Sequence, residues 1–176
     1  MTNSNGVYFK QEDYASFSRR VFIALVDILV LCAASFAFAI LIDALLTPTV
    51  ATGNLILSGI ALIVFGYLAL LKRSKIRTLG YRLAGVRIVG FDGEIASLSS
   101  LCLRVAFLPL GPNNWVFDLI WSSAPHRQAL RDKFAHTYVV KSGARPIGTG
   151  AILFNYYDVF CYNFLIQEVE VPTEQG

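Results

Sequence analysis

The sequence predicts an all-α membrane protein with a two-span helical hairpin, a broken third membrane segment, a small cytoplasmic β-ribbon and an interfacial C-terminal helix. Composition is the first reason, because 55% of the 176 residues are hydrophobic and only 15% are charged, against about 25% charged in soluble domains. The mean hydropathy of +0.56 agrees with this. The second reason is that clusters of basic residues flank apolar runs long enough to cross a bilayer.

Two long apolar runs predict the hairpin, one over residues 21–46 and the other over residues 54–71. Their lengths lie near or above the roughly 20 residues that a helix needs to cross a bilayer. Basic residues precede the first run at 19–20 and follow the second at 72–77, and the connector between the runs carries no charge. The positive-inside rule therefore places the N-terminus and residues 72–100 in the cytoplasm.

The third apolar stretch, residues 101–121, is interrupted by PLGPNN at 109–114. Basic residues lie on both of its sides, so a segment that enters the membrane and returns fits the positive-inside rule better than a third crossing. Broken backbone at membrane depth is tolerated only where protein or water covers it. The re-entrant interpretation is favoured and places residues 122–145 in the cytoplasm, while a third crossing stays open.

Two short β-branched runs predict the ribbon, VRIVGFDGE at 86–94 and TYVVKSG at 137–143. Gly85 ends a short helical turn just before the first run, in a position where glycine is common. Because lone strands are not stable, residues 86–89 are expected to pair with residues 138–141. They can pair only if the segment between them returns to the same membrane face.

Residues 151–166, AILFNYYDVFCYNFLI, are apolar and aromatic but short for a span. Tyrosine favours the headgroup level of a bilayer, so this run predicts an interfacial helix, with packing against a partner subunit as the alternative. The chain therefore divides into a membrane domain over residues 1–145 and a C-terminal extension over residues 146–176.

Asp27 lies inside the first span, where a carboxylate at the helix centre costs roughly 2.5–3.5 kcal/mol on insertion scales. An ionisable residue there has a partner or a role in ion or proton movement. Arg20, seven residues earlier, extends its side chain toward the helix N-terminus and away from Asp27. Arg104, in the broken segment, is therefore the predicted partner of Asp27. A structural carboxylate and a proton- or cation-binding site both fit the sequence.

Asp132 lies in a basic segment together with Arg127, Arg131 and Lys133. It either braces the junction between a helix and the second ribbon strand or pairs with Arg20 at the membrane surface. Bracing is favoured, because surface carboxylates among basic residues are usually solvated pairs. The candidate charge network, for ion binding or for structure, has four members: Arg20, Asp27, Arg104 and Asp132.

No motif predicts an enzyme, a metal site or a cofactor. The histidines, His126 and His136, are ten residues apart and the three cysteines are far from one another, so neither set has the spacing of metal ligands. Gly80 and Gly85 do not form a phosphate-binding motif. The net charge of +3 is too small to indicate binding to nucleic acid.

Three blocks of the sequence can be compared with known families: YASFSRRVFIALVDILVL from residue 14, TLGYRLAGVRIVGFDGE from residue 78 and HRQALRDKFAHTYVV from residue 126. Together they resemble the RDD family of small bacterial integral membrane proteins. The resemblance implies that Arg20, Asp27 and Asp132 are the arginine and two aspartates that give the family its name. Residues 78–82 differ from the Thr-Pro-Gly-Lys-like turn of the family, because both the proline and the lysine are absent.

We expect an accessory or assembly subunit of a membrane complex in the bacterial plasma (inner) membrane. The alternative is an oligomeric transporter or antiporter of protons or monovalent cations that uses Asp27, since the resemblance implies cation/proton antiport for some members. Two spans are too few to enclose a pathway in one chain, so transport would require a homo-oligomer. The expected partners are the lipid bilayer and either copies of the chain or other subunits.

Overall fold

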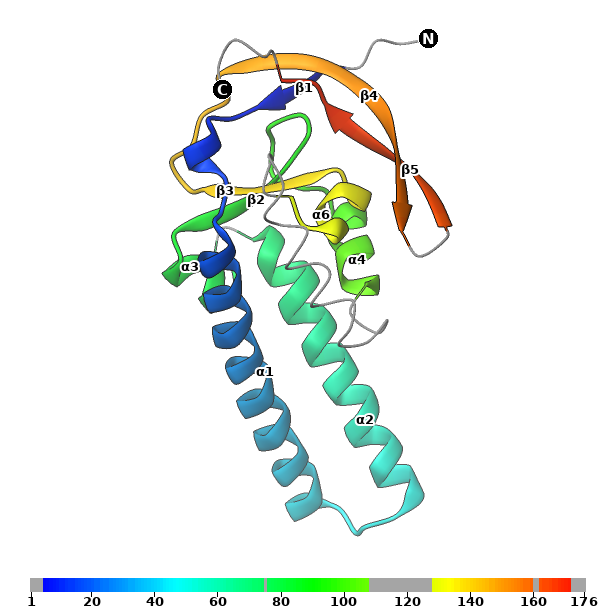
Figure 1. Ribbon diagram of the computed structural model, residues 1–176. Helices are drawn as coiled ribbons and strands as arrows, with labels where there is room; N and C mark the ends of the chain where they lie inside the picture. The colour runs from blue at the N-terminus through cyan, green and yellow to red at the C-terminus, as the bar shows by residue number, and fades with distance from the viewer. Residues whose placement is uncertain (1–4, 75, 108–127, 160–161, 172–176) are drawn as a thin grey trace.

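The chain forms three layers in the computed structural model, which describes residues 5–74, 76–107, 128–159 and 162–171. A long helical hairpin is the first layer, a two-stranded ribbon is the second and a three-stranded sheet is the third (Figure 1). The elements are, in chain order, β1 (Asn5–Tyr8), η1 (Gln11–Asp13), α1 (Phe17–Leu45), α2 (Val50–Phe65), η2 (Gly66–Leu71), α3 (Leu79–Leu83), β2 (Val86–Gly90), α4 (Leu98–Ala106), α6 (Leu130–Phe134), β3 (Thr137–Lys141), β4 (Gly148–Val159) and β5 (Tyr162–Val169).

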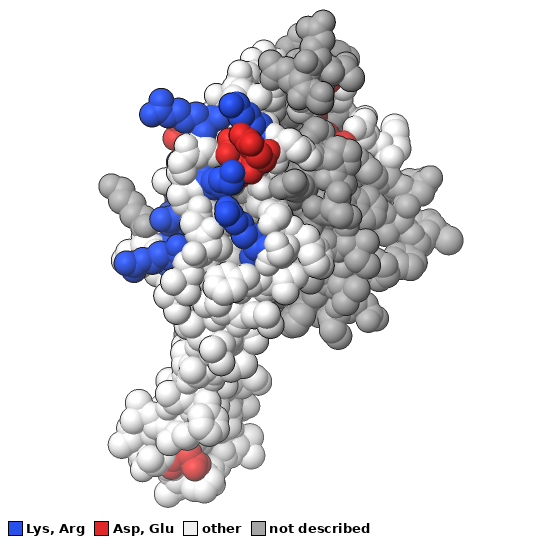
Figure 2. Space-filling model, turned by 60° about the vertical axis from the view of Figure 1, so that its left-hand side comes forward, with Lys and Arg blue, Asp and Glu red and all other residues white. Residues whose placement is uncertain are grey.

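The hairpin consists of α1 and of α2, which continues as the π-helical segment η2. Hydroxyl oxygens cap both helices, because Ser16 Oγ accepts from the Arg19 N–H (3.4 Å) and Thr49 Oγ1 accepts from the Thr52 N–H (3.2 Å). Phe17–Leu45 and Val50–Leu71 are long and apolar enough to cross a membrane. This agrees with the two predicted apolar helices, although the first one begins at Phe17 rather than at residue 21. On the face shown in Figure 2, the hairpin is almost free of charge.

The ribbon is the middle layer and is buried on both faces. β2 and β3 pair antiparallel, with Val86 opposite Lys141 and Gly90 opposite Thr137, which confirms the predicted pairing. One face of the ribbon packs on α1, α3 and α4, where the buried side chains are Ala15, Ile23, Tyr81, Val86, Ile88, Ala96, Leu101 and Val139. The ribbon thus connects the hairpin to the rest of the molecule, because its other face carries the third layer.

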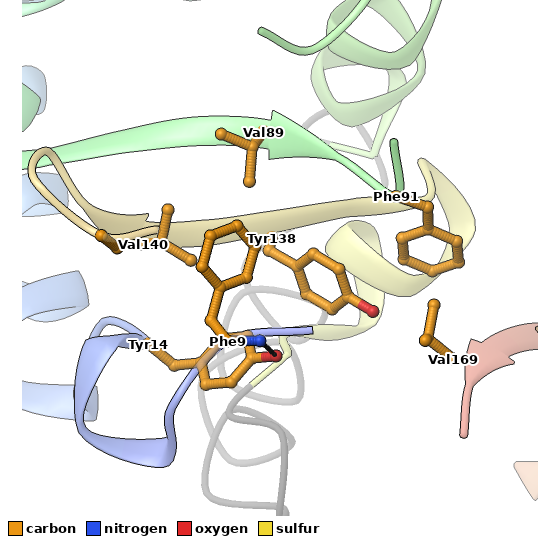
Figure 3. Packing of buried hydrophobic residues seen from close by; sticks show 8 residues of the cluster. Phe9, Tyr14, Val89, Phe91, Tyr138, Val140 and Val169 are labelled. Carbon is orange, nitrogen blue, oxygen red and sulfur yellow. Dashed lines mark hydrogen bonds between the residues drawn. The ribbon is translucent and has the colours of Figure 1, made fainter. Parts of the chain in front are cut away.

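The side chains on that other face pack in an aromatic cluster, which Figure 3 shows from close by. Tyr138 of β3 lies edge-on to Tyr14, with ring centroids 5.5 Å apart, and edge-on to Phe9 at 6.2 Å. The hydroxyl of Tyr14 accepts a hydrogen bond from the Phe9 N–H at 3.1 Å, the dashed line in Figure 3. Val169 of β5 packs into the same cluster, so the N-terminal segment and the last strand are held on the ribbon by one apolar core.

The third layer contradicts the predicted all-α class and the predicted C-terminal helix. Residues 148–159 and 162–169 form the strands β4 and β5, and the order of the sheet is β1-β4-β5. β1 pairs antiparallel with the beginning of β4, with Asn5 opposite Ala151 and Tyr8 opposite Gly148. The prediction was wrong because two apolar, aromatic strands that are close together in the sequence have the same composition as one apolar helix.

The predicted broken segment is described only in its first part. α4 covers Leu98–Ala106 and begins where Ser97 Oγ accepts from the Ser100 N–H at 3.1 Å. Residues 108–127 lie outside the described residues. Whether residues 101–121 re-enter or cross therefore stays a prediction.

The ribbon register predicts a position-dependent effect of proline. Ile88 O accepts from the Ala96 N–H at 3.4 Å, so the backbone polar groups of Ile88 point away from β3. These directions alternate along an antiparallel strand, and the N–H of Val89 therefore points toward β3. Val89→Pro should lower the free energy of unfolding by about 1–3 kcal/mol more than Val89→Ala, because it removes a buried ladder donor.

Thermal or urea unfolding in detergent measures this difference, and the Ile88→Pro and Ile88→Ala pair is the control. Proline at Ile88 removes an N–H that faces away from β3, so its extra cost relative to alanine should be smaller. An equal extra cost at the two positions would contradict the register.

Candidate functional site

Asp132 is the centre of a buried charge cluster between the hairpin and the ribbon, formed with Arg20 and Arg104. It lies in the first turn of α6 and is fully buried. Its Oδ2 accepts a hydrogen bond from Arg20 Nη1 of α1 at 2.6 Å, and its Oδ1 accepts one from Arg104 Nη1 of α4. Both arginines are 5% exposed. One carboxylate therefore joins three helices that are far apart in the sequence.

The surroundings of this charge cluster keep the Asp132 carboxyl ionised. Arg104 also donates to Thr137 Oγ1 of β3 at 2.7 Å and to the hydroxyl of Tyr81 at 3.4 Å. Burial alone would raise the pKa of Asp132, but the charges of Arg104, Arg20 and Arg131 outweigh it and lower this pKa to about 2. The stability that the ionised carboxylate contributes is complete above about pH 4 and is lost as the pH falls toward 2.

Asp27 forms a second, separate site at the contact between α1 and α3, and it is 4% exposed. Its Oδ1 accepts from the hydroxyl of Tyr67 and from the Gly80 N–H, each at 2.9 Å, and its Oδ2 accepts from the Thr78 hydroxyl at 2.9 Å. The Tyr67 hydroxyl in turn accepts from the Leu79 N–H at 3.1 Å. Three donors thus fix Asp27 to the beginning of α3 and to η2.

Gly80 allows this contact because no side chain fits there. A Cβ atom at Gly80 would lie 2.6 Å from the Ile23 carbonyl oxygen and 2.7 Å from Asp27 Oδ1. At the other end of α3, Gly85 has φ +66°, a left-handed conformation that suits glycine and ends the helix. The predicted helix end at Gly85 is confirmed.

The predicted Asp27–Arg104 pair is wrong. Arg104 donates to Asp132, and the donors to Asp27 are uncharged groups of Tyr67, Thr78 and Gly80. The physical reason is that nearby hydroxyl and backbone N–H groups already satisfy the oxygens of Asp27, whereas Asp132 neutralises Arg104. Of the four predicted residues, the structure brings Arg20, Arg104 and Asp132 together and places Asp27 at a site of its own. The pairing of Asp132 with Arg20 is the alternative that the sequence analysis placed second.

Tyr67, Thr78 and Gly80 were not expected at the site. The signal for two of them is the sequence TLG at 78–80, in which a hydroxyl and the N–H of a glycine precede a short helix. Tyr67 lies in the π-helical turn of η2, a conformation that is often found at functional sites. A tyrosine inside an apolar run looks like an ordinary membrane residue in the sequence, so only the fold identifies it.

A cavity of about 460 Å³ borders both carboxylate sites. Its polar wall includes Arg20, Asp27, Lys72 and Arg104, and its apolar wall comes from α1 and from the α2–η2 helix. The Lys72 ammonium lies 5.0 Å from the ring centroid of Tyr81. Burial, with the charges of Arg131 and Arg104, lowers the pKa of Lys72 to about 7. Among the described residues, no group of three or more His, Cys, Asp or Glu side chains could hold a metal ion.

Comparison with known proteins gives one match. A model described as the RDD family matches residues 14–136, a range that contains Arg20, Asp27, Arg104 and Asp132. This confirms the resemblance that the three sequence blocks indicate. The comparisons with curated proteins and with solved structures gave no match.

Asp132→Asn should be among the most destabilising single changes in the protein. It leaves Arg20 and Arg104 buried without their carboxylate, and removing one partner of a buried ion pair typically costs about 3–5 kcal/mol. Asp43→Asn is the control, because Asp43 is an exposed aspartate on the same helix as Arg20. Unfolding in detergent measures both variants, and equal stability of the two would show that the charge cluster does not hold the layers together.

Proposed function

The chain belongs to the RDD family, and we propose that it is an accessory or assembly subunit of a membrane complex in the bacterial plasma membrane. The family and the two apolar helices fit a membrane protein. In this proposal the hairpin anchors the protein in the bilayer, and the ribbon and the three-stranded sheet lie in the cytoplasm, where other subunits can bind them.

The distribution of charge supports this orientation. On the face shown in Figure 2, basic side chains gather where the hairpin meets the ribbon, and the remainder of the hairpin is almost uncharged. Arg19, Arg73 and Arg82 are exposed at this end. Because basic residues beside membrane helices favour the cytoplasmic side, this distribution supports the proposal that the N-terminus lies in the cytoplasm and the α1–α2 connector on the opposite side.

The observation that carries the accessory role is the exposed outer part of the β4–β5 hairpin. β1 pairs with residues 148–151 only, whereas β4 and β5 remain paired from Ile152 to Val159. Leu153, Phe154 and Tyr156 are 44%, 58% and 79% exposed. Since neighbouring side chains of a strand point to opposite faces, this hairpin presents apolar groups on both of its faces.

Contact with another protein surface would stabilise such a hairpin by burying its exposed apolar side chains. A two-stranded hairpin is marginally stable in water, and an open strand edge with apolar side chains invites pairing with another chain. A partner subunit would bury these side chains, which corresponds to the alternative that the sequence left open for residues 151–166. We call the part of β4 and β5 that lies beyond β1 the outer hairpin, and we propose that it is the surface that binds the partner subunit.

The alternative is transport of protons or monovalent cations by Asp27. Asp27 borders the cavity, as a carrier carboxylate would. However, three protein donors hold its two oxygens, and Arg20, Lys72 and Arg104 border the same cavity. Positive charges close to a carboxylate oppose the entry of a further cation, so a fixed structural role fits Asp27 better.

Purification in mild detergent tests the accessory role. The tagged protein, extracted from its native membrane, should be recovered in a stable complex with one or more different subunits, as measured by native mass spectrometry. The variant Phe154→Ser with Tyr156→Ser should reduce the recovery of these subunits at least about tenfold, because large aromatic side chains are frequent hot spots of interfaces.

Ile147→Ser is the matched control, because Ile147 is 42% exposed and precedes β4 outside the outer hairpin. It should leave the complex intact. Recovery of the wild-type protein alone as a homo-oligomer would contradict the accessory role. Equal loss of subunits from the control and the double variant would contradict the outer hairpin as the binding surface.

Asp27→Asn separates the two functions. Asparagine retains an acceptor for Gly80 and Tyr67 and loses the charge, so we expect a loss of about 1–2 kcal/mol in stability and an unchanged complex. In proteoliposomes with an internal pH-sensitive dye, the wild-type protein and the variant should show the same background flux of protons. Proton flux coupled to sodium or potassium in the wild type, lost in Asp27→Asn, would favour the transporter and overturn the accessory proposal.

A further inference from the structure

We propose that the cavity beside the charge cluster binds the phosphate head group of an anionic phospholipid, with the beginning of an acyl chain between α1 and the α2–η2 helix. The inference rests on the proposed membrane location of the hairpin. It is independent of whether the protein has partner subunits, and it assigns a ligand to a cavity that the accessory role does not require.

The polar wall of the cavity selects for an anion. Four cationic side chains border it, against the single carboxylate of Asp27: Arg20, Lys72, Arg104 and Arg131. Asp132 does not line the cavity, and its carboxylate accepts hydrogen bonds from Arg20 and Arg104. Lys72 has no carboxylate bonded to it among the residues that the structure describes, and its ammonium lies over the Tyr81 ring. A phosphate in the cavity would give Lys72 the anionic partner that the described residues do not supply.

The protonation of Lys72 agrees with an anionic ligand. Burial and the nearby charges of Arg131 and Arg104 lower the pKa of its ammonium to about 7. An opposite charge within a few ångströms stabilises the protonated form of a lysine. Binding of a phosphate would therefore relieve the repulsion among these cations, and this relief contributes to the affinity for the phosphate.

The apolar wall selects for a lipid rather than a soluble anion. Val21, Leu25 and Ile28 of α1 face Val64 and Leu68 of the α2–η2 helix across the cavity. A volume of about 460 Å³ is within the usual range for small-molecule sites. A molecule with a charged head and an aliphatic chain matches both walls. Inorganic phosphate would match only one of them.

The position of the cavity, at the end of the hairpin that contacts the ribbon, suits a lipid head group. Arg20 lies in the first turns of α1, and Lys72 follows directly after η2, so both cations lie where the two helices reach the ribbon. In the proposed orientation this is the cytoplasmic surface of the membrane. Basic pockets between membrane helices at that level are known to recognise acidic head groups.

Binding by the purified full-length protein tests the proposal. Dioleoyl-phosphatidylglycerol, dioleoyl-phosphatidylcholine, glycerol 3-phosphate and inorganic phosphate are titrated separately, and the thermal stability and the bound mass are recorded. Phosphatidylglycerol should stabilise the protein and stay bound, whereas the other three should do neither. Equal effects of the two lipids would overturn the anionic head group, and equal effects of phosphatidylglycerol and inorganic phosphate would overturn the lipid.

Lys72→Gln should weaken phosphatidylglycerol binding about five- to tenfold, whereas Lys72→Arg should retain it. Arg73→Gln is the matched control, since Arg73 is exposed, adjacent in the sequence and outside the cavity lining. It makes the same change of charge and should bind like the wild type. Equal weakening by Lys72→Gln and Arg73→Gln would show a diffuse attraction between basic surface and acidic lipid and would overturn the site.

A second pair of variants tests the apolar wall and keeps the proposal testable if Lys72→Gln does not fold. Leu68→Trp reduces the volume on the aliphatic side without changing charge and should weaken phosphatidylglycerol binding. Leu57→Trp is the control, because Leu57 lies on α2, is 69% exposed and does not line the cavity. This variant should bind phosphatidylglycerol like the wild type. Unchanged binding in Leu68→Trp would overturn the placement of the acyl chain. Failure of the accessory role would leave these results unaffected.

Discussion

The arrangement of the layers depends on neutralising two almost fully buried arginines. Arg20 and Arg104 come from α1 and α4, and each alone would be costly to bury. Asp132 binds both of them, and the chain continues from α6 directly into β3. The position of the ribbon on the hairpin is therefore set by a charge requirement as well as by apolar packing. A second buried pair, Lys133 with Glu168 of β5, extends the same principle from α6 to the third layer.

Some elements could be predicted from sequence patterns and others could not. The hairpin follows from uninterrupted hydrophobicity, and the ribbon follows from two β-branched runs that need each other. The C-terminal strands were missed because the mostly apolar and aromatic run at 151–166 fits one helix as well as two paired strands, and because β1, which pairs with the beginning of β4, is far from it in the sequence. The importance of Asp27 was visible in the sequence, since a carboxylate in an apolar run is costly. Its donors were not, because Tyr67 of η2 and Gly80 of α3 are 40 and 53 residues away from it in the sequence and meet it only in the fold.

The two departures from the common turn of the family have a structural meaning here. Leu79 stands where a proline is usual, and its N–H donates to the Tyr67 hydroxyl, a bond that proline cannot make. Tyr81 stands where a lysine is usual; its hydroxyl accepts from Arg104, and its ring lies beneath the Lys72 ammonium.

The pairing of β1 with β4 also has a consequence for the order of events on the ribosome. β1 is synthesised well before its partner strand, because the paired residues Asn5 and Ala151 are 146 residues apart in the sequence. At about 5–20 residues per second, roughly 7–30 seconds separate the two. The helical hairpin can enter the bilayer during this interval, whereas residues 5–8 must wait without a strand partner. The pairing of β1 with β4 thus forms only after the helical hairpin has been synthesised.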